Sequence, residues 1–86
     1  MCKVYLPSRL RMVANNQTWI EIEAATIQET LHILLENFPK LRPLIMDENK
    51  LNLYTRIFIN NNEARDLDKI IQQNDTVHII QAMAGG

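Results

Sequence analysis

The chain has 86 residues, of which 47% are hydrophobic and 22% are charged, and its formal net charge is −1. This length and composition are typical of one folded domain with a modest core and exclude a disordered chain. The near-zero charge provides no field that would attract a phosphate backbone, so we do not expect a nucleic acid partner.

The first two predicted elements are strands. Residues 4–6 alternate between apolar and polar side chains and predict a strand that faces a core on one side. Residues 9–16 are predicted to form a polar bend, in which Asn15 and Asn16 adopt left-handed backbone in place of glycine. Residues 17–23 alternate again, and we expect this second strand to pair with the first as a hairpin.

A helix is predicted to begin at Thr26. Thr26 and Glu29 have the spacing of a capping box, in which each side chain satisfies a backbone N–H at the helix start. Pro39 ends the helix. Between them runs one apolar stripe, which indicates a helix that lies across a sheet: Ile27, Leu31, Leu34, Leu35 and Phe38.

The second half of the chain adds two strands. Residues 39–52 are predicted to be irregular, with apolar side chains that fill an edge of the core. Residues 53–60 predict a third strand, residues 67–71 a short helical turn and residues 76–81 the last strand. The strand residues expected to face the core are Val4, Leu6, Ile57, Ile59, Val77 and Ile79.

The order strand, strand, helix, strand, short helix, strand predicts an α+β roll, with a mixed sheet and one main helix packed on one face. This is the β-grasp, or ubiquitin-like, plan. We expect residues 1–86 to form a single domain of this kind, with a flexible Gly-Gly tail over residues 82–86.

The opposite face of the predicted sheet carries an apolar patch. If the core residues point to the helix, Tyr5, Phe58 and Ile80 emerge together on the other side. Large apolar side chains on a solvent face mark a partner surface, and scattered surface residues are the alternative. Arg56 and Met83 extend the patch toward the tail, so we expect these five residues to bind a partner.

We expect no catalytic or metal site in the chain itself. Glycine occurs only at the end of the chain, which excludes a glycine-rich phosphate loop, and no paired Cys or His spacing suits zinc. His32 and His78 fall on polar or outward faces and are expected to be solvated, and Cys2 lacks the setting of a nucleophile. The lone cysteine, the absence of a signal-peptide pattern and the absence of a long apolar run favour a cytoplasmic protein without a membrane segment.

The two glycines of the chain are its last two residues, Gly85 and Gly86. A tail of Ala84, Gly85 and Gly86 can thread a narrow channel, because glycine has no Cβ, and it presents the α-carboxylate of Gly86. This carboxylate is a poor electrophile, so ATP must activate it on an enzyme before a sulfur or amine nucleophile can attack. A frayed terminus is the alternative interpretation, and proteolysis is a second route to a terminal Gly86.

The strand order, the terminal Gly-Gly, residues 56–61 and residues 74–80 resemble the MoaD/ThiS family of ubiquitin-like sulfur carriers over essentially the whole chain. Residues 6–11 and 45–65 are most similar to the carriers of cysteine biosynthesis. Residues 81–83 depart from the family pattern, in which proline and valine often precede the two glycines.

The resemblance implies that an E1-like adenylyltransferase adenylates Gly86 with ATP and that sulfur transfer then gives a thiocarboxylate. The implied acceptor is a pyridoxal-phosphate-dependent cysteine synthase, the large subunit of a molybdopterin synthase or a thiazole synthase. The chain would be a protein cosubstrate that binds no cofactor, or a non-catalytic subunit of a complex like molybdopterin synthase. Two alternatives are a protein modifier that is joined to lysines through Gly86 and a non-covalent β-grasp adaptor.

Overall fold

Strand β7 (Thr76–Gln81) lies inside a five-stranded sheet in the computed structural model, which describes residues 1–82. The strand order is β2-β1-β7-β5-β6, and β7 pairs in parallel with β1 and antiparallel with β5. The sheet is therefore mixed, as predicted. The other strands are β1 (Cys2–Tyr5), β2 (Trp19–Ile22), β5 (Thr55–Ile59) and β6 (Asn62–Ala64).

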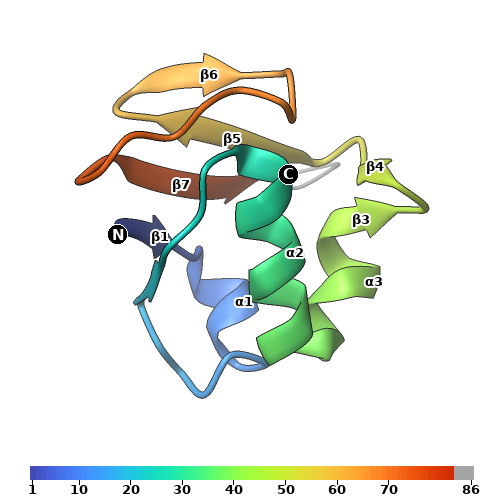
Figure 1. Cartoon of the computed structure of the whole chain (residues 1–86). Helices are drawn as coiled ribbons and strands as arrows, with labels where there is room; N and C mark the ends of the chain where they lie inside the picture. Colours follow the sequence, from blue (N-terminus) through green and yellow to red (C-terminus); the bar gives the residue numbers. More distant parts are fainter. Residues whose placement is uncertain (83–86) are drawn as a thin grey trace.

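Helix α2 (Ile27–Asn37) is the main helix, and Figure 1 shows α1, α2 and α3 on the same side of the sheet. The apolar stripe of α2 meets the inward residues of the strands in one hydrophobic core. All six strand residues predicted to face this core are buried. The smaller elements are α1 (Ser8–Arg11), a 3-10 turn η1 (Pro39–Leu41), α3 (Arg42–Ile45), β3 (Met46–Asp47) and β4 (Lys50–Leu51).

The predicted capping box at the start of α2 is present. Thr26 Oγ1 accepts a hydrogen bond from the Glu29 N–H at 3.1 Å, and Glu29 Oε1 accepts one from the Ala25 N–H at 2.7 Å. Both bonds satisfy N–H groups at the start of the helix that have no partner within it. Sequence spacing alone was sufficient here because every group involved lies within five residues.

Replacing Thr26 by alanine is expected to lower the free energy of unfolding by about 1 kcal/mol, because the Glu29 N–H loses its acceptor. The measurement is the midpoint of urea unfolding. Gln28→Ala is the control, since the exposed Gln28 side chain lies in the same helical turn. Equal losses in the two variants would show that the cap contributes nothing specific.

The predicted polar bend at residues 9–16 is wrong in its first half. Ser8–Arg11 form α1, and the side chains of Leu10 and Ala14 are completely buried. Burying one leucine outweighs the polar composition of the segment, and this burial depends on neighbours that are distant in the sequence. Asn15 and Asn16 do adopt left-handed backbone, with φ of 55° and 58°.

Residues 39–52 are more regular than predicted, because they form η1, α3 and the β3–β4 hairpin. Leu41 and Ile45 fill the edge of the core as expected, and both are fully buried. The third predicted strand begins at Thr55, two residues later than expected, since Leu53 stands in a turn with 94% of its surface exposed.

No helix forms at the short helical turn predicted for residues 67–71. Leu67 and Asp68 lie in a turn that the Lys69 N–H closes by donating to the Asp66 carbonyl at 3.0 Å, and Ile70 then pairs with Thr26 as an isolated bridge beside the start of α2. The N–H groups of Ile27 and Gln28 donate to the carbonyls of Lys69 and Leu67. Because these are first-turn N–H groups without partners inside α2, this contact between distant segments overrides the local helical spacing.

Strand β6 was not predicted. It follows a two-residue turn in which Asn60 and Asn61 have φ of 49° and 76°, the backbone that a tight hairpin requires. Asn60 and Asn61 thus replace the usual Asn-Gly. Of the predicted tail at residues 82–86, Ala82 is described, and Met83, Ala84, Gly85 and Gly86 lie outside the described residues.

Candidate partner-binding face and tail root

The register of the sheet aligns five side chains in a row across the face opposite α2. Tyr5 on β1 is the partner of Trp19 on β2 and of His78 on β7. Phe58 on β5 is the partner of His78 and of Glu63 on β6. Their neighbours along the central strands point into the core, so these side chains point away from it. We call this row, with Ile80, Arg56 and Lys3, the outer face.

Two ring contacts lie within the outer face, one between Tyr5 and His78 and one between Lys3 and Trp19. The rings of Tyr5 and His78 stack with their centroids 4.8 Å apart and their planes at 10°. Lys3 Nζ lies 4.6 Å from the ring centroid of Trp19. His78 lies on the outward side of β7, as predicted, but it is half-buried in the row and not fully solvated. Stacking holds these rings in fixed positions, which lowers the entropy lost when a partner binds.

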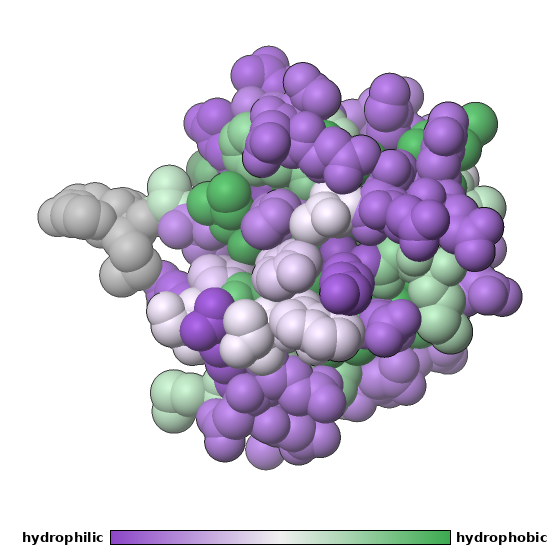
Figure 2. All heavy atoms as spheres, turned by 90° about the vertical axis from the view of Figure 1, so that its left-hand side faces the viewer, coloured by the Kyte–Doolittle hydropathy of each residue, from purple (hydrophilic) through white to green (hydrophobic). Residues whose placement is uncertain are grey.

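Ile80 and Arg56 are directly paired across β7 and β5 and continue the outer face toward the end of β7. Ile80 is 44% exposed, whereas Tyr5 and Phe58 are half-buried. The structure thus brings together four of the five residues predicted to bind a partner, and Met83 lies outside the described residues. Figure 2 shows one face of the molecule, with pale and green residues near its centre and hydrophilic residues around them.

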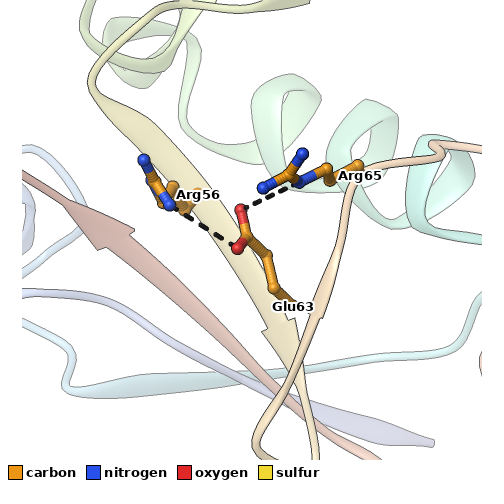
Figure 3. Close-up of polar contacts among 3 residues, drawn as sticks. All are labelled: Arg56, Glu63 and Arg65. Carbon is orange, nitrogen blue, oxygen red and sulfur yellow. Dashed lines mark ion pairs between the residues drawn. The ribbon is translucent and has the colours of Figure 1, made fainter.

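Glu63 lies between two arginines at the β6 side of the outer face (Figure 3). Its carboxylate oxygens are 3.5 Å from Arg56 Nη1 and 3.7 Å from Arg65 Nε. Such exposed pairs add little stability. The two pairs do orient the guanidinium groups of Arg56 and Arg65 beside the aromatic side chains, so the outer face has charged groups next to apolar ones.

Sequence reasoning missed Glu63, Trp19 and Lys3 as parts of the outer face and Arg65 as the neighbour of Glu63. Glu63 and Arg65 were missed because β6 was not recognised, although the asparagine turn was a usable signal for a hairpin. Trp19 was missed because its position beside Tyr5 depends on the pairing register, which the sequence does not specify.

The root of the tail is anchored to the turn before β5. The Ala82 N–H donates to the Tyr54 carbonyl at 2.9 Å, immediately after β7 ends at Gln81. Tyr54 is half-exposed beside this bond, and Leu53 projects next to it. The described part of the chain therefore holds the tail at a defined point on the rim of the sheet.

The other candidate groups do not form a reactive site. Cys2 is buried, its Sγ donates to the Ile22 carbonyl at 3.4 Å, and burial raises the pKa of its thiol. The thiol is therefore a poor nucleophile.

His32 is exposed, as predicted, with its Nε2 atom 3.7 Å from the Glu36 carboxylate. Within residues 1–82, no group of three His, Cys, Asp or Glu side chains could hold a metal ion, and no helix has the length and hydropathy of a membrane span.

The sequence model of the ThiS family matches residues 4–86. The chain belongs to the ThiS family. The predicted membership in the MoaD/ThiS family is therefore confirmed. No curated protein sequence matches this ThiS-family chain.

Solved structures confirm the β-grasp fold. A chain of the Amycolatopsis orientalis BexX/CysO complex is 24% identical, with a TM-score of 0.91 and 100% coverage of both chains. Mycobacterium tuberculosis CysO is 24% identical with a TM-score of 0.87, over 96% of this chain and 100% of that one. The small archaeal modifier protein SAMP1 of Methanosarcina acetivorans is 25% identical with a TM-score of 0.84, over 99% of this chain and 95% of that one.

Proposed function

We propose that this ThiS-family chain is a sulfur carrier that acts as a protein cosubstrate and delivers its own terminal carboxyl group to other enzymes. The observation that carries the proposal is the place of the Gly-Gly end. It follows a strand in the middle of the sheet, and the Ala82–Tyr54 bond anchors the chain four residues before Gly86. Four residues span at most about 14 Å, which is enough to enter a partner's pocket while the body docks outside.

The proposed chemistry has two steps. An oxygen of the Gly86 carboxylate attacks the α-phosphorus of ATP on an E1-like adenylyltransferase, and pyrophosphate leaves. Hydrosulfide, or an enzyme-bound equivalent, then attacks the carbonyl carbon of this mixed anhydride, and AMP leaves with the bonding electrons. The product is a thiocarboxylate at Gly86. ATP is bound by the partner in this scheme, and the chain supplies only the carboxylate.

The outer face is the proposed docking surface for the activating and accepting enzymes. Tyr5, Phe58 and Ile80 supply apolar area, and Arg56 supplies a charge that orients the encounter. Of the three implied acceptors, the cysteine branch is favoured by the similarity of residues 6–11 and 45–65. A molybdopterin synthase large subunit and a thiazole synthase are the other two acceptors.

Mass spectrometry of the intact chain tests the proposal. After incubation with ATP, sulfide and an E1-like adenylyltransferase, the mass is expected to rise by the difference between one sulfur and one oxygen. Fragmentation should place the change at Gly86. If the enzyme activates its own carrier under the same conditions but never this chain, the proposal is wrong.

Replacing Ile80 by aspartate is expected to weaken binding to the activating enzyme about 30-fold, because it places a charge where the enzyme would exclude water from the outer face. Calorimetric titration measures this affinity. Ile70→Asp is the matched control, since Ile70 is an equally large side chain, 67% exposed, outside the outer face. Equal weakening by both substitutions would remove the outer face from the docking model.

Protein modification is a second candidate, favoured by the similarity to the small archaeal modifier protein. In that reaction a lysine amine of a target protein attacks the activated Gly86 carbonyl and forms an isopeptide bond. Immunoblots distinguish the two functions, because a pure carrier gives no high-mass conjugates that resist thiol reductants. A non-covalent adaptor is contradicted if deletion of the tail abolishes cellular function.

A further inference from the structure

The inner face of the sheet ends in a polar pair just before the tail. Along β7 the inward positions are Val77, Ile79 and then Gln81, and the first two are buried apolar residues. The inward position of β5 that faces Gln81 is Thr55, whose exposed fraction is only 6%. Two polar side chains at this edge of the core lose hydration, so their hydrogen bonds decide whether they stabilise the structure.

These two side chains join Asn52 in a closed network of hydrogen bonds. Gln81 Nε2 donates to the Leu44 carbonyl at 2.6 Å and to Thr55 Oγ1 at 3.0 Å. Thr55 Oγ1 in turn donates to Asn52 Oδ1 at 2.6 Å, and Asn52 Nδ2 donates to the same Leu44 carbonyl at 2.9 Å. Each donor has an acceptor, so the network defines one orientation for both amides. We call Asn52, Thr55 and Gln81 the tail clamp.

The tail clamp connects the end of β7 to the turn before β5 and to the end of α3. Leu44 belongs to the last turn of α3, where helix carbonyls lack partners within the helix. Asn52 also accepts the Tyr54 N–H at 3.2 Å, and the Tyr54 carbonyl is the group that binds Ala82. The clamp therefore holds both the end of β7 and Tyr54, whose carbonyl accepts the bond that anchors Ala82.

Capping of α3 alone does not account for this arrangement. Asn52, only eight residues from Leu44, already donates to that carbonyl. Gln81 adds a second donor from 37 residues away, and this donor belongs to the residue that precedes the tail root. The contribution of Gln81 is thus to tie the last strand to the α3 end.

We propose that the tail clamp is a positioning device, which sets the direction in which the tail leaves the sheet and so aligns Gly86 with the reacting groups of the activating enzyme. This inference rests on the proposed delivery of Gly86. The outer face fixes where the body docks, and the clamp fixes how the tail starts from that body. A displacement of about 1 Å at reacting atoms costs roughly a hundredfold in rate, so such a device has a measurable effect.

The first test is amide hydrogen exchange at Ala82, measured by NMR on the whole chain. Gln81→Met keeps the length of the side chain but removes its donor. Exchange at Ala82 is expected to accelerate about tenfold relative to Ile79, because the bond to Tyr54 opens more often. Thr55→Val should act in the same direction, and Thr55→Ser, which keeps the hydroxyl, should restore protection.

The second test is the kinetics of ATP–pyrophosphate exchange with an E1-like adenylyltransferase that accepts the wild-type chain. Gln81→Met is expected to lower kcat about tenfold and to leave KM within about twofold, because docking is retained while the carboxylate is misaligned. Thr55→Ser should keep the wild-type kcat. A purely structural role would change only the unfolding midpoint.

Asn60→Gly is the matched control at the opposite end of β7. Asn60 also makes two side-chain bonds, to Asp75 and to the Thr76 N–H, and glycine tolerates its positive φ. The positioning role is overturned if Gln81→Met changes the relative Ala82 exchange and kcat no more than Asn60→Gly does. It is also overturned if Gln81→Met changes the exchange at Ala82 but not kcat. If the wild-type chain is never adenylated, the proposed function fails and the alignment role fails with it, whereas the absence of the Gln81→Met effects in a chain that is adenylated overturns the positioning role alone.

Discussion

Deletion of Gly86 is expected to abolish thiocarboxylate formation and to leave the fold unchanged. The deletion moves the reacting carboxylate back by one residue, roughly 3.5 Å of extended chain. Nucleophilic attack on ATP requires the reacting atoms within about 3.5 Å of each other, so the shortened chain no longer reaches. The measurement is the intact mass after incubation with ATP, sulfide and the adenylating enzyme, with the unfolding midpoint recorded in parallel.

A chain lengthened by one alanine after Gly86 is the complementary variant to this deletion. It keeps both glycines but moves the carboxylate forward by the same distance, so it is also expected to lose the mass gain. A shortened or lengthened chain that gains sulfur as well as the wild type would contradict the carrier mechanism. Binding of either chain to the activating enzyme should remain, because the outer face is unchanged.

Replacing Leu10 by alanine is expected to lower the free energy of unfolding by about 3 kcal/mol. Leu10 is completely buried, although it lies in a segment whose composition is polar. The substitution removes apolar contacts and leaves a cavity beneath α1. A loss of this size is a large part of the stability of a small domain, so unfolding by urea should shift strongly at an unchanged slope.

Met12→Ala is the control for the Leu10 prediction. Met12 lies at the end of the same helix, but 79% of its surface is exposed, and its loss should change the free energy of unfolding by less than about 0.5 kcal/mol. If the two substitutions cost the same, α1 does not contribute to the core as the structure shows.

Local patterns in the sequence were sufficient for the elements whose stabilising groups are close neighbours. The alternation in β1, β5 and β7 predicted which side chains face the core, because successive residues of a strand point to opposite sides. The spacing of Thr26 and Glu29 predicted the start of α2. The same alternation also indicated that Tyr5, Phe58 and Ile80 share the outer face.

The sequence by itself thus determined the β-grasp plan, the start of α2 and the inward side of the central strands. Only the tertiary structure decided that Leu10 is buried in a helix, that the carbonyls of Leu67 and Lys69 accept from the first turn of α2, and that Gln81 meets Leu44. The physical reason is the same in each case. A side chain's burial, or the partner of a backbone N–H, depends here on groups distant along the chain, and no periodicity within one segment contains that information.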